Sequence, residues 1–233
     1  MNKIFTKENK NRLKIKLRKK LNPYLAPFRR QLEGVNSPFT IISNNCWGGL
    51  VYQYYGFSYD TPTVGMYFFA EDYVKFVSNL KHYLEIDIQF ISYEQSKYKE
   101  TLIKKEQTQK IIGALDDVEI VFLHYHSIEE AREKWNRRKA RIHWDNLFLK
   151  FSEMNQCKFE HMRAFDDLPF ENKLILVSQD YGLKSQVIVK EFTREHEVYD
   201  DTTSFREGIS LKPMANKETI KAIGSMIIIV TLH

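Results

Sequence analysis

Short apolar runs along the chain alternate with segments whose apolar residues recur every three or four positions, and this pattern predicts strands separated by helices. The runs that we assign to strands are residues 39–43, 64–69, 86–92, 118–126, 174–178, 186–192 and 226–232. Helices are expected after residue 46, ending near Gly56, and over residues 70–84 and 128–141. Residues 143–156 are a further apolar element, helix or strand, and residues 93–110 are a polar, solvated excursion. The alternation predicts a three-layer α/β/α fold with a mixed, largely parallel sheet.

The first 33 residues differ from the rest of the chain in charge. They contain eleven Lys or Arg residues and two Glu residues, a net charge of +9, whereas the remainder carries −4. Their apolar residues are spaced by three and four positions, as in an amphipathic helix: Leu13, Leu17, Leu21, Leu25, Phe28 and Leu32. We therefore predict a basic amphipathic helical segment over residues 1–33, followed by a single α/β domain over residues 34–233.

Three partners fit such a cationic stripe: the chain's own domain, an anionic membrane surface, or a polyanion. Docking of the apolar stripe on the chain's own domain is the most common role of such a helix. Nucleic acid is not expected as a partner, because the rest of the chain lacks a basic face with interleaved aromatic residues. The sequence shows no apolar run long enough for a secretory signal or a membrane span. We expect a cytoplasmic protein, which is peripheral at the inner membrane if the stripe binds lipid.

The turn after the first predicted strand, residues 43–49, is the leading candidate site. It places a thiol, two side-chain amides and two glycines at a helix N-terminus, where free N–H groups attract an anion or stabilise a thiolate. Cys46 is a nucleophile in one interpretation and a small buried residue of the turn in the other. The residues expected to line a ligand are Asn44, Asn45, Trp47, Gly48 and Gly49.

Two further predicted strands end in polar residues, one in His124 and His126, the other in Asp180. The carboxyl ends of parallel strands share one edge of a sheet, so these groups would meet Cys46 there if all three strands are neighbours. The catalytic hypothesis makes His124 the general base, and Asp180 either orients it or binds sugar hydroxyls. His126 lies two positions from His124 on the same strand face, and we include it as a ligand-binding group.

Other common sites are not expected. The glycines lack G-x-G-x-x-G spacing and no Walker lysine is present, so we expect no cofactor. Cys46 and Cys157 lack metal-ligand spacing, so we expect free thiols and no metal. On the helix over residues 128–141, Arg137 and Arg138 are interpreted as solvated, and Arg141 as a candidate anion-binding residue.

Three segments carry a resemblance to a known family: SNNCWGG, GMYFFAEDYVKFVSNLKHYL and FLHYHSIEEAREKWNRRKARIHWDNLF. They resemble the bacterial family catalogued as domain of unknown function 1919, over residues 39–178. Members of that family are often labelled exopolysaccharide or capsule biosynthesis proteins. The resemblance implies a three-layer α/β/α domain and an association with surface-glycan assembly. His126 departs from the residue expected at its position, which leaves His124 as the better candidate base.

The leading functional hypothesis is a glycosyl or acyl transferase acting on surface polysaccharide, with a nucleotide-sugar or acyl donor held at the turn and a glycan as acceptor. Two alternatives stay open. One is a hydrolase with Cys46 as its nucleophile. The other is a non-catalytic glycan-binding or assembly factor that stacks sugars on aromatic side chains: Trp47, Tyr54, Tyr55, Trp135 and Trp144.

Overall fold

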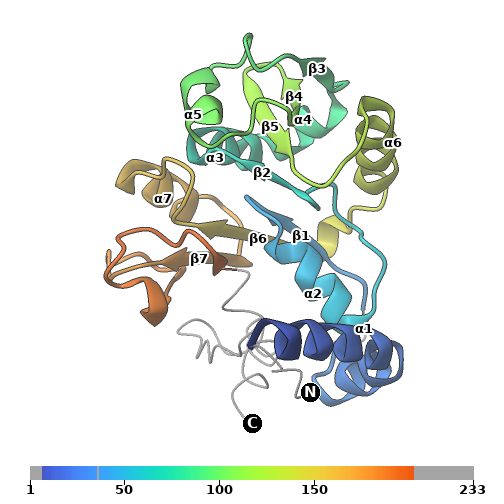
Figure 1. Ribbon diagram of the computed structural model, residues 1–233. Coiled ribbons are helices and arrows are strands. Elements are labelled where there is room, and N and C mark those ends of the chain that lie inside the picture. Colours follow the sequence, from blue (N-terminus) through green and yellow to red (C-terminus); the bar gives the residue numbers. More distant parts are fainter. Residues whose placement is uncertain (1–6, 36, 202–233) are drawn as a thin grey trace, which may run out of the picture.

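The computed structural model describes residues 7–35 and 37–201, and its strands form two four-stranded sheets (Figure 1). The first sheet is parallel and has the order β1 (Thr40–Ser43), β6 (Leu147–Ser152), β7 (Lys173–Val177) and β8 (Gln186–Ile188). The second is antiparallel and has the order β2 (Met66–Phe68), β5 (Val118–Phe122), β4 (Ile111–Leu115) and β3 (Gln89–Ile91). The α/β class is confirmed, with parallel and antiparallel strands in separate sheets instead of one mixed sheet. The strand expected over residues 226–232 lies outside the described residues.

The antiparallel sheet is inserted between two neighbouring strands of the parallel sheet. The chain leaves β1, forms all four antiparallel strands, and returns to pair β6 with β1 in the register Ile41 to Phe148. The two sheets meet at the carboxyl end of β1, where the Phe68 N–H donates to the Asn44 carbonyl (3.0 Å). The insertion therefore lies against the edge of the parallel sheet where ligands of α/β domains bind.

Helices cover both faces of the parallel sheet, because successive residues of a strand point to opposite sides. On one face, Ile42 and Leu149 pack with residues of α3 (Ala70–Ser78) and α7 (Phe159–Asp166). On the other face, Ile41 and Phe148 pack under α2 (Trp47–Tyr55), which ends at the left-handed Gly56. These three layers place the start of α2 at the carboxyl end of β1.

The other helices lie around the antiparallel sheet or follow it. They are α4 (Leu80–Glu85), α5 (Lys99–Lys104) and α6 (Ile128–Lys139), with a 3-10 turn at Trp144–Asn146. A second 3-10 turn, Lys190–Phe192, follows β8 of the parallel sheet. The helix expected over residues 70–84 is divided at Asn79 into α3 and α4. The predicted start of α6 is confirmed, since the Ser127 hydroxyl accepts a hydrogen bond from the Glu130 N–H (3.1 Å). The structure also has three elements that the sequence pattern did not predict, α5, β4 and α7. Helix α5 lies within residues 93–110, which we interpreted as a solvated excursion, and its Leu102 side chain is fully buried.

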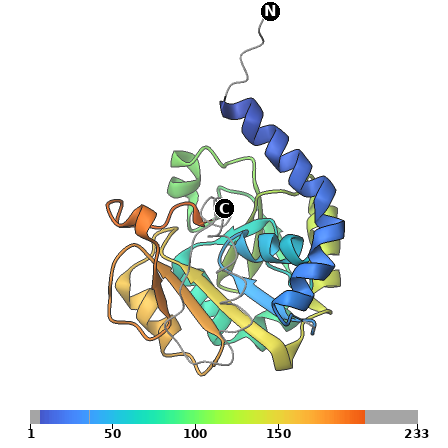
Figure 2. The same cartoon turned by 90° about the horizontal axis from the view of Figure 1, so that it is seen from below.

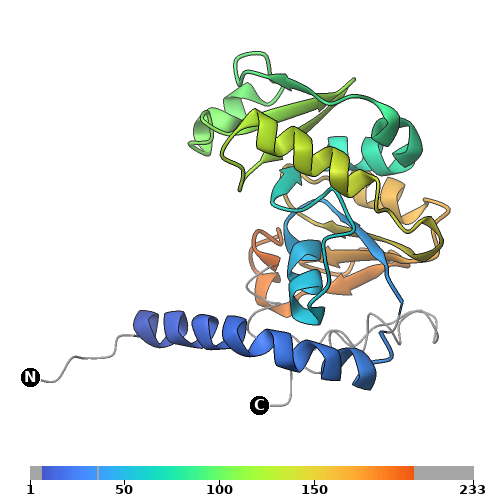
Figure 3. The ribbon, with the colours of Figure 1, turned by 90° about the vertical axis from the view of Figure 1, so that its right-hand side faces the viewer.

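Helix α1 (Lys7–Leu32) is long, and its N-terminal half projects beyond the rest of the described chain (Figures 2 and 3). Its C-terminal half docks on the end of α2, with the Asn22 amide donating to the Gln53 carbonyl (2.5 Å). The guanidinium groups of Arg29 and Arg30 donate to the carbonyls of the last two residues of α2. Because the last carbonyls of a helix have no partner within it, α1 completes the hydrogen bonding of α2.

Candidate functional site

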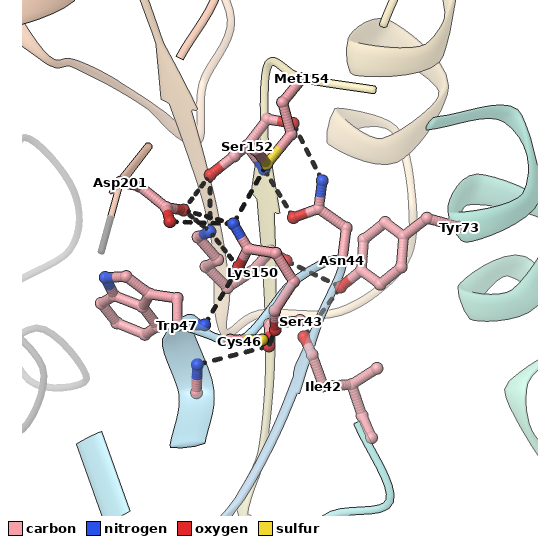
Figure 4. A network of polar contacts seen from close by, with 12 residues as sticks. Ile42, Ser43, Asn44, Cys46, Trp47, Tyr73, Lys150, Ser152, Met154 and Asp201 are labelled. Carbon is pink, nitrogen blue, oxygen red and sulfur yellow. Dashed lines mark hydrogen bonds and ion pairs between the residues drawn. The ribbon is translucent and has the colours of Figure 1, made fainter. Parts of the chain in front are cut away.

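An ion pair between Lys150 and Asp201 is buried at the carboxyl end of β1 and β6 (Figure 4). The two side chains are only 2% and 1% exposed. The Lys150 ammonium donates to the Asp201 carboxylate, to the Ser152 hydroxyl (2.5 Å) and to the Asn45 side-chain oxygen (3.1 Å). We refer to Asn45, Lys150, Ser152 and Asp201 together as the Lys150 cluster.

The Asp201 carboxylate is the acceptor on which the cluster converges. It accepts hydrogen bonds from the Lys150 ammonium, from the Ser152 hydroxyl and from the Asn45 amide, whose nitrogen is 2.9 Å from each carboxylate oxygen. Removing two charges from water costs several kcal/mol per ion unless the pair is also hydrogen-bonded. The surrounding hydroxyl and amide therefore make this burial tolerable, and the cluster is a closed polar network.

Strand β6 places Lys150 and Ser152 on the same face, because they are two residues apart in a strand. Burial of the Lys150 side chain lowers its pKa, and the neighbouring Asp201 carboxylate opposes that effect. The Lys150 ammonium also lies 5.5 Å from the centre of the Trp47 ring, a cation–π distance. The site can therefore hold an anion by charge and hydrogen bonding, and can use a lysine that releases its proton more readily than a solvated one.

Asn44 connects the two strands that carry the cluster. Its amide donates to the Ser152 carbonyl (3.0 Å), and its side-chain oxygen accepts from the Ser152 N–H (3.0 Å). The side chain is fully buried and continues the hydrogen bonding between β1 and β6 by one further step. Asn44 therefore fixes the position of Ser152, whereas the adjacent Asn45 belongs to the cluster itself.

The N–H groups at the start of α2, which we expected to hold an anion, already have acceptors. The Trp47 N–H donates to the Asn45 side chain (3.1 Å) and the Gly48 N–H to the Ser43 hydroxyl (3.4 Å). The Gly49 N–H donates to a backbone carbonyl of the same turn (3.1 Å). In this structure the side-chain amide of Asn45 donates to the Asp201 carboxylate, and the backbone amides stabilise the turn.

Gly48 and Gly49 allow α2 to pack closely against its neighbours. A Cβ atom at Gly48 would lie 3.1 Å from a methyl group of Ile41, and one at Gly49 would lie 3.2 Å from a methyl group of Val64. Both distances are tighter than ordinary van der Waals contact. The two glycines are therefore explained by packing.

Cys46 lies beside the cluster as a half-buried thiol. Its sulfur donates to the Met66 carbonyl (3.7 Å), not to an imidazole. Burial raises the pKa of Cys46, and the Asp201 charge adds to the increase. Since the thiolate is the nucleophile, these surroundings do not favour a Cys46 hydrolase.

The structure does not bring His124 and Asp180 together at one sheet edge. His124 and His126 follow β5 in the antiparallel sheet and are exposed, so the assumption that all three strands share one sheet is wrong. The Asp180 carboxylate is exposed and accepts from the Gly182 N–H (2.9 Å), which lowers its pKa. The His124 N–H donates to the Gly65 carbonyl (3.1 Å), and Gly65 precedes the residue that accepts from the Cys46 thiol. Of His124 and Asp180, only His124 has a backbone contact with the Gly65 turn next to Cys46.

The arginines of α6 differ from the expectation. Arg138 is buried, donates to the Tyr125 hydroxyl (2.7 Å) and lies 5.0 Å from the centre of the Tyr59 ring, so the solvated interpretation is wrong for it. Arg137 pairs with Glu133 on the surface. Arg141, the candidate anion-binding residue, is exposed at the end of the helix.

Three of the five aromatic residues expected to stack on sugars are buried: Trp47, Tyr55 and Trp135. Tyr54 is half-buried and Trp144 is 44% exposed. A platform for sugar stacking that needs all five side chains is therefore not formed.

Sequence reasoning missed Lys150, Ser152 and Asp201. A signal for Lys150 was present, since it is the one charged residue in the strand sequence LFLKFS. A lysine in a strand buried on both faces needs a partner, which points to a site. Asp201 had no such signal, because it lies outside the strands and pairs with a lysine 51 residues earlier.

The described residues contain neither a cluster of metal ligands nor a membrane-spanning helix. Among residues 7–35 and 37–201, His, Cys, Asp and Glu form no group of three placed to hold a metal ion. Within the same ranges, every helix is too short or too polar to cross a membrane.

The chain belongs to the family described as domain of unknown function (DUF1919), whose sequence profile matches residues 17–222. The match includes every residue of the Lys150 cluster. An uncharacterized protein of Haemophilus influenzae is 32% identical to this chain over 166 residues, which are 71% of this chain and 74% of that protein. These comparisons establish the family and assign no reaction.

Proposed function

We propose that the protein is a transferase that moves a glycosyl or acyl group in the assembly of bacterial exopolysaccharide or capsule, and that the Lys150 cluster binds the anionic part of the donor. The observation that carries this proposal is the convergence of three donor side chains on one carboxylate at the carboxyl end of a parallel sheet. Open α/β domains bind their ligands at that edge. The polysaccharide part rests on the family resemblance of the three quoted segments.

The chemistry of the cluster suits a diphosphate. Most nucleotide sugars and all acyl-coenzyme A donors contain one, and an ammonium, a hydroxyl and an amide are groups that hydrogen-bond phosphate oxygens. In the structure, the Asp201 carboxylate occupies the position that we propose for the diphosphate of the donor. Asp201 comes from the segment after β8 and not from the sheet, so its withdrawal would leave Lys150, Ser152 and Asn45 in position for the ligand.

His124 is the acceptor-side base in this proposal. It is exposed, and its backbone contacts the Gly65 turn beside Cys46. The imidazole would take the proton of an acceptor hydroxyl while the oxygen of that hydroxyl bonds to the sugar or acyl carbon. The bond from that carbon to the donor's leaving group breaks, and the leaving group departs with the electron pair. Asp180 has no part in this step, because its carboxylate binds its own loop.

A thermal-unfolding screen tests the proposal. The wild type, Lys150→Met and Lys97→Met are heated with nucleotide sugars, with acyl-coenzyme A donors and with short acidic glycans. Lys97→Met is the matched control, because it removes a lysine that pairs with a buried carboxylate at the antiparallel sheet. A ligand at about 100 times its Kd stabilises the folded state by about 2.7 kcal/mol, which shifts the unfolding temperature measurably.

We expect one donor class to raise the unfolding temperature of the wild type and of Lys97→Met, and to leave that of Lys150→Met unchanged. Stabilisation by acidic glycans alone would replace the transferase by a glycan-binding role. If a donor stabilises Lys150→Met as much as the wild type, the donor site lies elsewhere.

A further inference from the structure

Helix α1 exposes an apolar stripe to solvent. Five large apolar side chains recur along it at intervals of four and three residues, and each is between 42% and 64% exposed: Leu17, Leu21, Leu25, Phe28 and Leu32. At about 100° per residue these positions fall within one arc of roughly 80° on the helix surface. Tyr24, which is 80% exposed, lies at the edge of the same arc.

The opposite side of α1 holds the rest of the chain. Ala26 is buried against the end of α2, and Asn22 and Arg29 donate hydrogen bonds to carbonyls of that helix. The ring of Tyr54 lies under the Arg29 guanidinium at 4.3 Å. Because these three residues of α1 lie about a quarter to two-fifths of a turn from the middle of the stripe, the docked helix keeps its apolar side chains directed away from the domain.

Basic side chains lie near the N-terminal end of the stripe. Lys16 and Lys20 are exposed, and the first 33 residues together carry a net charge of +9 while the remainder of the chain carries −4. A cationic helix with one exposed apolar face has the properties of a segment that lies in the plane of an anionic membrane surface. A protein partner could cover the apolar residues, but it would not account for the concentration of positive charge on this one segment.

We propose that α1 binds the surface of a bilayer containing anionic lipids, with Leu17, Leu21, Leu25, Phe28 and Leu32 inserted at the headgroup boundary. The α/β domain then lies on the water side, held by the contacts of Asn22 and Arg29. No part of the described fold has to separate for the helix to bind. This inference does not depend on the transferase proposal.

Vesicle co-sedimentation of the full chain tests the inference. The wild type is mixed with vesicles of phosphatidylcholine and phosphatidylglycerol, and separately with vesicles of phosphatidylcholine alone. The test variant carries Leu21→Glu and Leu25→Glu. The matched control carries Ile103→Glu and Ile188→Glu, because these two residues are similarly exposed apolar side chains on α5 and β8. Thermal unfolding of both variants verifies that they are folded.

We expect the wild type and the control to bind the anionic vesicles, and the test variant to partition about a hundredfold more weakly, roughly tenfold for each leucine removed. Added salt should weaken binding, because it screens the lysine charges. Equal binding by the test variant, or equal binding to neutral vesicles, would overturn the proposal. So would a wild-type dimer that the test variant dissociates, since the stripe would then hold a second copy of the chain.

Discussion

Each of the two sheets has a buried carboxylate beside it that is paired with a lysine, and the two pairs are built differently. At the parallel sheet, both Lys150 and Asp201 are buried. At the antiparallel sheet, Asp72 is fully buried, but its partner Lys97 is 38% exposed at a distance of 2.6 Å. Only the pair at the parallel sheet therefore removes a cation from water, which is the costlier arrangement.

The groups around each pair show what it does. The Asp72 carboxylate accepts the Glu119 N–H (2.7 Å), and the Glu119 carboxylate accepts the Lys97 N–H (3.0 Å). These carboxylates satisfy backbone donors, so they fix a loop to β5 and serve the fold. Within the part of the chain that the structure describes, the Lys150 and Asp201 side chains make their hydrogen bonds to other side chains. An ion pair that satisfies no backbone group is available to a ligand.

The largest expected effect comes from breaking the pair at the parallel sheet. Lys150→Met or Asp201→Asn alone leaves one buried charge without its partner, and each should lower the free energy of unfolding by about 3–5 kcal/mol. The double variant leaves no buried charge, so it should be more stable than either single variant. Denaturant unfolding of the four proteins measures the coupling. Additive losses in the double variant would contradict a directly coupled pair.

Asp72→Asn should have a smaller effect, a loss of about 1–3 kcal/mol in the free energy of unfolding. The amide oxygen can still accept one hydrogen bond, whereas the ion pair with Lys97 is lost. The same denaturant experiment measures this loss. Donor-induced stabilisation should be unchanged in this variant, and a loss of that stabilisation would show that the antiparallel sheet also takes part in binding.

The pH dependence of the free energy of unfolding tests whether burial raises the pKa of Asp72. Burial raises the pKa of Asp72 above its ordinary value of 3.8, despite the opposing effect of Lys97. As the pH falls, the folded state takes up this proton before the unfolded state does, so the Asp72 contribution to stability rises and is complete below about 3.8. Relative to Asp72→Asn, the wild type should therefore gain stability as the pH falls from neutral to about 4. A difference that does not vary with pH would contradict the raised pKa.

The smallest expected effect is on the reactivity of Cys46. Burial and the Asp201 charge both raise the pKa of its thiol. Alkylation by iodoacetamide at mildly alkaline pH should be slow in the folded wild type and faster in Asp201→Asn, because removing the carboxylate favours the thiolate. Peptide mass spectrometry distinguishes Cys46 from Cys157, and Cys46→Ala is the control. An unchanged rate in Asp201→Asn would show that the carboxylate does not act on the thiol.

Much of the fold could be predicted from periodicity, and part of the site could not. The strands at β1, β5 and β7 and the turn with Asn45 follow from local patterns, because strands and caps depend on neighbouring residues. Which strands share a sheet does not follow, since β6 joins β1 across more than 100 residues. The prediction consequently gave His124 a place at the parallel sheet. It also overlooked Lys150, because the apolar segment around it was compatible with a helix or a strand.

The most direct test of the central claim, that Asp201 takes the place of a ligand's diphosphate, uses inorganic pyrophosphate as the probe. The unfolding temperatures of the wild type, Asp201→Asn and Lys150→Met are measured over a range of pyrophosphate concentrations. We expect pyrophosphate to stabilise Asp201→Asn more strongly than the wild type, because the competing carboxylate is gone, and to leave Lys150→Met unchanged. If pyrophosphate stabilises Asp201→Asn no more than the wild type, the carboxylate does not occupy an anion site and the account is contradicted.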